Sequence, residues 1–331
     1  MNSFGAETTT DQVLDGIDLS GRRFVITGAS GGLGEESTRA LAARGATVTM
    51  LARNPAKNEA AAERVRRRVP DADLELGTID LASLADIRRF AAEYLSSHDA
   101  IDVLVNNAGV MACPQGSTAD GFETQFGTNH LGHFLLTALL APAVLRGSRP
   151  RIINLSSAGH TTSDVNLDDI NFEAGDYDPW IAYGRSKTAN ALFSRGLAQR
   201  LGDQGVLSFS VHPGGIMTEL ARHLNDELIQ QMLDRTRARS AERPGAEGQP
   251  SGEPDGGFKF KSVEAGAATQ VWASVADLAE HNGAYLADCQ VGVEGGNPNT
   301  TGFMSYLRND ANVERLWTLS ERLVGQPFPT K

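Results

Sequence analysis

Short apolar runs alternate with longer segments of helical periodicity along most of the chain. Runs of this kind, bounded by turn residues, are typical of buried strands, and the 3.6-residue period is typical of amphipathic helices. Strands that alternate with helices at this spacing predict an α/β fold with a doubly wound parallel sheet of about seven strands and helices on both faces. The predicted strands are 23–26, 47–51, 74–76, 103–105, 152–155, 207–211 and 283–286, and the predicted helices are 33–44, 56–68, 83–97, 122–145, 181–201 and 262–279.

This pattern covers residues 21–331 as a single domain, and residues 1–20 form an N-terminal extension. An insertion over about 219–262 interrupts the pattern on the side where we expect the substrate. Within it, residues 236–257 are rich in Pro, Gly, Ser and charge, a composition that cannot bury a core and predicts a mobile loop. A lid over the substrate site and an inert surface loop are both compatible with that composition.

A glycine-rich turn follows the first predicted strand. Strand 23–26 runs directly into Thr27-Gly28, Gly32 and Gly34 follow, and a helix begins there. Glycines allow a tight turn and a close approach of the backbone to a pyrophosphate, and a helix N-terminus offers free N–H groups. The turn therefore predicts a dinucleotide site of the Rossmann type.

A tyrosine and a lysine share one face of the predicted helix 181–201. Tyr183 precedes Lys187 by four residues, a spacing that brings the phenol and the ammonium together. Lowering a phenol pKa from ~10 to neutrality requires roughly 4 kcal/mol, and one positive charge at ~4 Å supplies about that much at an effective dielectric constant of ~20. Tyr183 is thus a candidate acid/base. Tyr177 is a weaker rival, because Ile181 offers it no cation.

The glycine spacing is G-x-x-x-G-x-G, and at this point the chain resembles the short-chain dehydrogenase/reductase superfamily, over about residues 18–325. The segments GVMACP, TNHLGHF and YGRSKTANALF resemble its retinol-dehydrogenase and WW-domain-oxidoreductase branch. Further motifs that carry the resemblance are Asp80-Leu81, Asn106-Asn107-Ala108-Gly109, Asn129, Ser156-Ser157, Tyr183 with Lys187, and His212-Pro213-Gly214.

The resemblance implies a role for each matching residue. It makes Tyr183 the general acid/base, Lys187 the residue that lowers its pKa and binds the nicotinamide ribose, and Asn129 the holder of a water in a proton relay. Ser157, which matches the motif better than Ser156, would hydrogen-bond the substrate oxygen. Asp80 would contact the adenine, Asn107 the adenosine pocket and Thr218 the nicotinamide amide. The complete cofactor set is Gly28, Ser30, Gly32, Leu33, Gly34, Arg53, Asp80, Leu81, Asn107, Ala108, Gly109, Tyr183, Lys187, Pro213, Gly214 and Thr218.

The end of the second strand indicates which nicotinamide is preferred. NAD-selective sites place a carboxylate there to hold the ribose 2′-OH, but this strand ends Leu51-Ala52-Arg53. Arg53 can hold a 2′-phosphate instead, and a charge-assisted hydrogen bond of about 1.5–3 kcal/mol corresponds to a roughly 10- to 150-fold preference for NADP(H). Arg53 as a solvated surface residue, and the use of NAD(H) as well, stay open.

The substrate class follows from the resemblance alone. The branch implies a hydrophobic alcohol or carbonyl compound of steroid, retinoid or aromatic type, and Met111, Met217 and Leu220 lie near the expected pocket. The segment between Ser157 and Tyr183 is longer than in short family members. Its Trp180, Tyr177 and His160 could line the pocket or pack the loop. A non-catalytic dinucleotide-binding regulator or scaffold is the alternative function, and the complete Ser, Tyr and Lys set favours the enzyme.

Charge and composition narrow the partners. The net charge of −11 argues against binding to nucleic acid or anionic membrane. Cys113 and Cys289 have no paired spacing, and His130 and His133 have no third ligand at metal spacing, so we expect helix packing and no metal. No signal peptide and no apolar run of ~18 residues is evident, which predicts a cytoplasmic protein. A homodimer and a homotetramer are both open.

Overall fold

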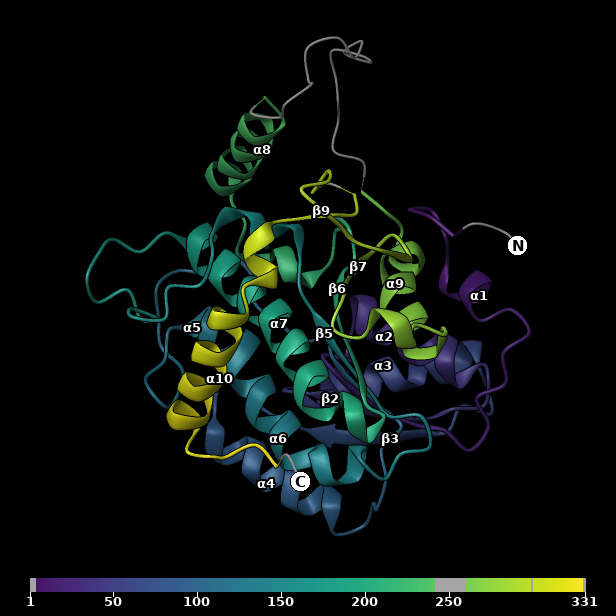
Figure 1. Ribbon diagram of the computed structural model, residues 1–331. Helices are drawn as coiled ribbons and strands as arrows, with labels where there is room; N and C mark the ends of the chain where they lie inside the picture. The colour runs from purple at the N-terminus through teal and green to yellow at the C-terminus, as the bar shows by residue number, and fades with distance from the viewer. Residues whose placement is uncertain (1–3, 242–259, 299, 330–331) are drawn as a thin grey trace.

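A sheet of eight strands runs through the centre of the computed structural model, which describes residues 4–241, 260–298 and 300–329 (Figure 1). The strand order is β3-β2-β1-β4-β5-β6-β7-β8, and every pair is parallel except β7–β8. The eighth strand was not predicted, because two residues are too short to leave a pattern. The strands are β1 Arg23–Thr27, β2 Thr47–Ala52, β3 Leu74–Thr78, β4 Val103–Asn106, β5 Arg151–Leu155, β6 Leu207–His212, β7 Tyr285–Ala287 and β8 Gln290–Val291.

Helices cover both faces of this sheet, so the predicted doubly wound α/β fold is confirmed. One layer holds α2 Gly32–Ala42, α3 Pro55–Arg68 and α9 Val263–Val275, and the other holds α4 Leu84–Leu95, α6 Gly132–Val144, α7 Pro179–Leu201 and α10 Asp310–Val324 (Figure 1). Alternate residues of β1 serve the two layers: Phe24 and Ile26 pack with α2, α3 and α9, whereas Val25 packs with α4, α6 and α7. The two cores therefore share one sheet in a single domain.

The strand order reverses between β1 and β4. Ile26 of β1 lies beside Met50 of β2 on one side and Val105 of β4 on the other. β2 and β3 follow β1 on one side of it in the sheet, and the chain then crosses to β4 on the other side. The loops that follow β1 and β4 therefore diverge. In open α/β sheets, ligands bind in the crevice outside the carboxyl ends of the strands at such a point. The topology thus places a ligand site where the sequence puts its glycine turn.

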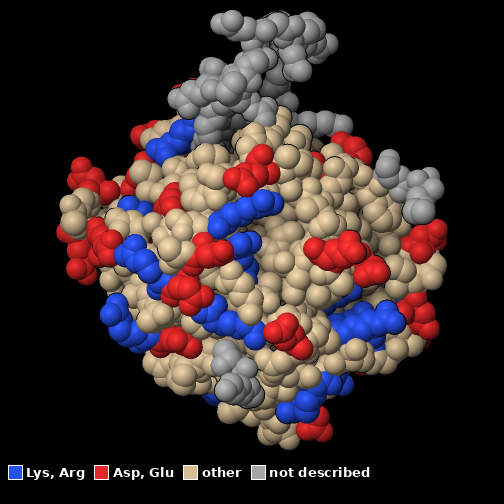
Figure 2. Space-filling model, viewed as in Figure 1, with Lys and Arg blue, Asp and Glu red and all other residues tan. Residues whose placement is uncertain are grey.

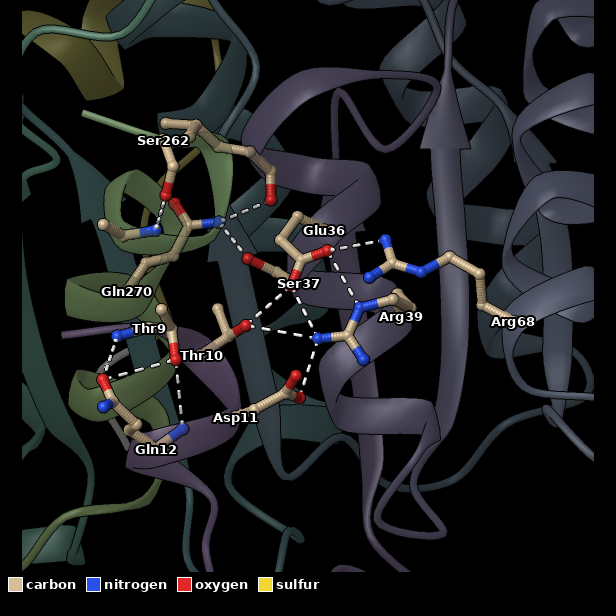
Figure 3. Close-up of polar contacts among 12 residues, drawn as sticks. Thr9, Thr10, Asp11, Gln12, Glu36, Ser37, Arg39, Arg68, Ser262 and Gln270 are labelled. Carbon is tan, nitrogen blue, oxygen red and sulfur yellow. Dashed lines mark hydrogen bonds and ion pairs between the residues drawn. The ribbon is translucent and has the colours of Figure 1, made fainter. Parts of the chain in front are cut away.

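The N-terminal extension packs against the domain through α1 Thr10–Val13 (Figure 3). The Glu36 carboxylate, 5% exposed on α2, accepts hydrogen bonds from Thr10 Oγ1 at 2.6 Å and from Arg39 Nη2 at 2.7 Å. Arg39 also reaches Asp11 at 2.8 Å, and Val13 is buried against the core. A buried charge is tolerated only when it is paired and hydrogen-bonded. This network fastens the extension to α2, the helix that follows the glycine turn.

The insertion after β6 contains a helix. A short 3-10 turn, Glu219–His223, leads into α8 Asp226–Ala241, which projects from the body of the protein (Figure 1). The prediction of a loop is wrong for residues 236–241, because Arg and Ala are good helix formers and extend α8 before the Pro- and Gly-rich part begins. The remaining part of the predicted loop, 242–257, lies outside the described residues.

The face of the protein shown in Figure 2 is mixed in charge. Lys, Arg, Asp and Glu side chains lie interspersed over the face in Figure 2. Within residues 4–241, 260–298 and 300–329, no helix has the length and apolar character needed to cross a membrane.

Smaller elements complete the described chain. The small elements are α5 Thr124–Phe126, a π-helical turn Gly127–Leu131, a parallel pair β9 Val293–Glu294 and β10 Gly302–Phe303, and 3-10 turns at Ala158–Thr162, Gly202–Gln204, Ala279–His281 and Ser305–Arg308.

Candidate active site

The glycine turn forms a narrow cradle at the start of α2. Gly28 and Gly32 have φ values of +67° and +53°, in the left-handed region that favours glycine. A Cβ on Gly34 would lie 2.3 Å from the Gly28 carbonyl oxygen, so helix and strand can meet only without a side chain there. A Cβ on Gly32 would lie 3.2 Å from Thr218 Cγ2, which places Thr218 over the turn. The free N–H groups of α2 and this bare turn fit a dinucleotide pyrophosphate.

Neighbouring side chains hold the turn in place. Ser30 and Leu33 are half-buried within it, and the Ser30 carbonyl accepts a hydrogen bond from Arg64 of α3 at 3.3 Å. Asn107, after β4, donates from Nδ2 to the Thr27 carbonyl at 2.7 Å and so ties the β4 loop to the end of β1. A Cβ on Gly28 would lie 2.9 Å from the Ala108 Cα, so these loops are in close contact.

The residues that the sequence predicts to contact adenosine and a 2′-phosphate follow β2 and β3. Asp80 is half-buried after β3 and accepts a hydrogen bond from the Ala82 N–H at 3.0 Å, and Leu81 beside it is buried. Arg53 follows the last residue of β2 and is exposed, with no hydrogen-bond or ion-pair partner among the described residues. By contrast, Lys57 of α3 is paired with Glu219 at 3.1 Å. The Arg53 guanidinium is therefore available to an anion at this edge.

Tyr183 and Lys187 lie together in the buried part of α7. Tyr183 is only 3% exposed, and burial raises its pKa to about 12, with a hydrogen bond to Ser157 acting in the opposite direction. Lys187 Nζ lies 5.6 Å from the Tyr183 ring centroid and donates to the Leu155 carbonyl at 3.0 Å. Burial lowers the pKa of Lys187 to about 8. Desolvation thus dominates the pKa of Tyr183 in this structure, and the lowering of that pKa by Lys187 stays a prediction.

The two adjacent serines after β5 have different surroundings. Ser156 is buried and donates from Oγ to the Lys187 carbonyl at 2.8 Å, so it joins β5 to α7. Ser157 lies close enough to Tyr183 to lower the pKa of its phenol, and its Oγ accepts the Gly159 N–H at 3.0 Å. A Cβ on Gly159 would lie 2.6 Å from Tyr183 Cε1, so this glycine lies flat against the phenol ring. Ser157 is therefore the serine that shares a site with Tyr183, and Gly159 was missed because nothing in the sequence marks that contact.

Asn129 lies in a π-helical turn that interrupts the predicted helix 122–145. Such turns are frequent at functional sites. Asn129 Oδ1 accepts the Val110 N–H at 2.8 Å, and Nδ2 donates to the Val110 carbonyl and to Ser186 Oγ, both at 2.9 Å. A Cβ on Gly109 would lie 3.1 Å from Asn129 Oδ1 and 3.6 Å from Lys187 Nζ. The β4 loop, Asn129 and α7 thus converge.

The loop after β6 closes the site from the other side. His212 Nδ1 accepts hydrogen bonds from the Ala158 N–H at 3.2 Å and the Gly214 N–H at 3.3 Å, which joins the Ser157 loop to Pro213-Gly214. Gly214 has φ +93°, and a Cβ there would lie 2.7 Å from Lys261 Cε. Lys261 pairs with the buried Asp288. This lysine was missed, since it follows the Pro- and Gly-rich segment with no motif around it.

The three residues left open in the segment before Tyr183 separate into two groups. Tyr177 is bound through its hydroxyl to Gln125 and Glu123, both at 3.0 Å, and His160 is buried with Nδ1 2.6 Å from the Ser157 carbonyl, so both pack the loop. Trp180 instead faces Tyr183, with ring centroids 6.3 Å apart and an interplanar angle of 80°.

An apolar wall stands beside the phenol. Trp180 and Tyr183 form a buried cluster with Ala112, and the half-buried residues Met111, Leu224 and Leu228 pack against it. Leu224 precedes α8 and Leu228 lies in its first turn, and Trp180 Nε1 donates to the Leu228 carbonyl at 3.2 Å. Neither leucine was predicted. Of the other apolar candidates, Leu220 is half-buried and Met217 is 64% exposed.

The paired histidines of the π-helical turn and α6 have polar partners within the protein. His130 Nε2 lies 2.8 Å from Ser320 Oγ, and His133 Nε2 lies 2.9 Å from Thr27 Oγ1. In the described part of the chain, no group of three or more His, Cys, Asp or Glu side chains could hold a metal ion.

Comparison with known proteins agrees with this geometry. Residues 22–229 match the short chain dehydrogenase family. The chain is 36% identical to retinol dehydrogenase 12 of Mus musculus, over 93% of this chain and 88% of that protein, and 37% identical to the short-chain dehydrogenase/reductase prx1 of Penicillium roqueforti, over 94% and 87%. A crystal structure of an uncharacterized protein from Mycobacterium paratuberculosis superposes with a TM-score of 0.71 at 33% identity, covering 96% of this chain and 98% of the other. The chain therefore belongs to the short-chain dehydrogenase family of oxidoreductases, and resembles its retinol dehydrogenases.

Proposed function

We propose that the protein is an NADP(H)-preferring oxidoreductase that interconverts a bulky apolar alcohol and its ketone or aldehyde, with Tyr183 as general acid/base. The observation that carries the proposal is the shared site of Ser157, Tyr183 and Lys187, which lies next to the apolar wall of Trp180. The same edge of the sheet presents the glycine cradle, so a hydride carrier and a proton donor can meet there.

The residues of the cradle would hold the cofactor. The N–H groups at the start of α2 and the bare turn at Gly28, Gly32 and Gly34 favour a pyrophosphate, and the Arg53 guanidinium favours a 2′-phosphate. When bound, the nicotinamide donates or accepts the hydride. Lys187 and Asn129 lie within a few ångströms of Gly109, in the loop after β4.

The protein's own groups manage the proton. Because its pKa is raised to about 12, the Tyr183 phenol is protonated at neutral pH and can give its proton to a carbonyl oxygen. Ser157 donates a second hydrogen bond to the same oxygen and polarises it. Lys187, with a pKa of about 8, is mostly charged at pH 7 and stabilises the phenolate that remains. A protonated phenol suits carbonyl reduction, whereas alcohol oxidation first requires its deprotonation.

The proposed substrate class has two supports. The wall of Trp180, Met111, Leu224 and Leu228 is apolar and offers hydrophobic burial to a large substrate. Two similar proteins, one from mouse and one from human, are named retinol dehydrogenases, and retinol is an apolar alcohol. A retinoid, steroid or aromatic alcohol or ketone is consistent with both the apolar wall and the names of these relatives.

A turnover assay tests the proposal against the alternative of a non-catalytic dinucleotide-binding scaffold. Wild type, Tyr183→Phe and the control Tyr177→Phe are compared on a panel of bulky ketones and aldehydes with NADPH, and NADPH affinity is measured by fluorescence titration. We expect Tyr183→Phe to lose about 10²- to 10⁴-fold in kcat at nearly unchanged NADPH affinity, and Tyr177→Phe to keep its turnover. Wild-type protein that binds NADPH and reduces no member of the panel would support the scaffold.

A further inference from the structure

His133 connects two parts of the site that the catalytic roles above do not join. It is 1% exposed in the first turn of α6, and its ring lies between the end of β1 and the π-helical turn. Nδ1 lies 2.9 Å from the Asn129 carbonyl oxygen, and Nε2 lies 2.9 Å from Thr27 Oγ1. Both ring nitrogens are therefore used, each toward a different element of the site.

The protons of this bridge can be assigned from the chemistry of the partners. A carbonyl oxygen only accepts, so Nδ1 of His133 carries the proton that is donated to Asn129. Burial lowers the pKa of His133 to about 4, so the ring is neutral at pH 7 and has no second proton. Nε2 must accept, and the Thr27 hydroxyl donates to it at 2.9 Å, a shorter contact than its 3.5 Å alternative to the Val105 carbonyl.

The Thr27 hydroxyl in turn orients the loop after β4, residues 107–110, which we call the cofactor loop. With its hydrogen directed at His133, the Thr27 oxygen keeps two lone pairs, and it accepts the Asn107 N–H at 2.9 Å and the Ala108 N–H at 3.0 Å. One hydroxyl thus makes all three hydrogen bonds available to it. Without the His133 ring to accept its proton, the Thr27 hydroxyl can rotate toward the Val105 carbonyl. The two lone pairs that accept the Asn107 and Ala108 N–H groups then lose their fixed direction.

Asn129 holds the other end of the same loop and the catalytic helix. Its amide forms two hydrogen bonds with Val110 and one with Ser186 Oγ, and Ser186 donates in turn to the Tyr183 carbonyl at 2.8 Å. We propose that His133 is a positioning residue that locks residues 107–110 at both ends, through Thr27 and Asn129, and so aligns the cofactor loop with Tyr183. This role rests on the proposed dehydrogenase function.

His130 provides an internal comparison. It lies three residues before His133, is equally buried, and hydrogen-bonds through Nε2 to Ser320 Oγ of α10 at 2.8 Å. Burial lowers the pKa of His130 to about 3, so this ring is neutral too. Ser320 belongs to α10, which packs against α7 in the layer opposite α2, the helix of the cradle. Removing the Ser320 hydroxyl therefore removes the partner of a buried histidine without touching the cofactor loop.

The experiment compares five variants of the whole chain: His133→Leu, Thr27→Val, the conservative Thr27→Ser, the control Ser320→Ala and the double variant His133→Leu/Thr27→Val. NADPH affinity, kcat and melting temperature are measured for each. We expect His133→Leu and Thr27→Val to weaken NADPH binding by about tenfold or more and to lower kcat. Thr27→Ser should stay within about threefold of wild type. Ser320→Ala should change the melting temperature alone. The double variant His133→Leu/Thr27→Val should lose less than the sum of the two single losses, because both single variants remove the contact between His133 and Thr27.

Amide hydrogen exchange on the protein without cofactor tests the same role independently of activity. Exchange at Asn107 and Ala108 should be faster in His133→Leu than in wild type and unchanged in Ser320→Ala. If His133→Leu exchanges like wild type at these amides, or if it folds and keeps wild-type NADPH affinity and kcat, the proposal is overturned. Should His133→Leu fail to fold, the contrast between Thr27→Val and Thr27→Ser decides. A wild type that binds no NADPH refutes the proposed function, while the exchange data still decide the positioning role.

Discussion

Gly159 lies against the ring of Tyr183, and a methyl group on it would approach the Cε1 carbon to 2.6 Å. That distance is well below van der Waals contact, and the ring is buried, so either the ring or the Ser157 loop must move. Gly159→Ala should therefore lower kcat by about 10- to 100-fold, since a misplacement of ~1 Å can cost that much, while NADPH affinity stays nearly the same. Steady-state kinetics and a fluorescence titration check both expectations.

The matched control for this variant is Gly175→Ala. Gly175 lies in the same segment between Ser157 and Tyr183 and is exposed, and a methyl group on it would meet no atom within 4 Å among the described residues. It should keep wild-type kcat. Equal turnover in Gly159→Ala and Gly175→Ala would mean that the position of the phenol ring does not limit the reaction.

The proposed preference for NADP(H) depends on Arg53. Its side chain is exposed at the end of β2, without a protein partner in the described chain, and no acid ends that strand. Arg53→Ala should weaken NADPH by about 1.5–3 kcal/mol, or roughly 10- to 150-fold, and leave NADH nearly untouched. Arg67→Ala, which removes an equal charge from the exposed end of α3, is the control. A wild type that binds NADH better than NADPH in the same titration contradicts the prediction.

The sequence could predict the sheet and the centre of the site because both depend on local patterns. The apolar runs mark seven of the strands of the large sheet, and the glycine spacing marks the turn after β1. The four-residue interval between Tyr183 and Lys187 places both on one helix face whatever the rest of the fold does. These features require no knowledge of which distant residues meet.

Features that depend on distant contacts or on burial could not be predicted. The π-helical turn that holds Asn129 continues directly into α6, and nothing in the sequence separates it from that helix. The contact of Gly159 with Tyr183 joins separate elements. The direction of the Tyr183 pKa shift depends on desolvation, which spacing does not show. Likewise, Glu36 and Arg39 look like surface residues until the N-terminal segment is seen to cover them.

The buried Lys187 should make the folded protein less stable at neutral pH than a variant without the charge. Its pKa falls from 10.5 to about 8 in the fold, so between these values the unfolded chain holds a proton that the native state lacks, and stability rises with pH across that window. Below pH 8 the full penalty of about 3 kcal/mol applies. Lys187→Met should thus be more stable at pH 7 by about 1–3 kcal/mol, and the Leu155 carbonyl keeps its 2.9 Å hydrogen bond from Asn190.

Urea unfolding of wild type and Lys187→Met at pH 7 and pH 10 tests this balance, because comparing the two proteins at each pH cancels the titrating groups that do not interact with residue 187. The advantage of Lys187→Met should shrink to below about 1 kcal/mol at pH 10, where the unfolded chain is losing the proton as well. Lys57→Met removes an equal charge at an exposed position and is the control. The variant should also lose turnover, since the phenolate of Tyr183 would have no cation beside it. A Lys187→Met protein that is less stable than wild type at pH 7 would contradict the prediction. It would show that the buried ammonium stabilises the fold, so that its place in the active site does not lower stability.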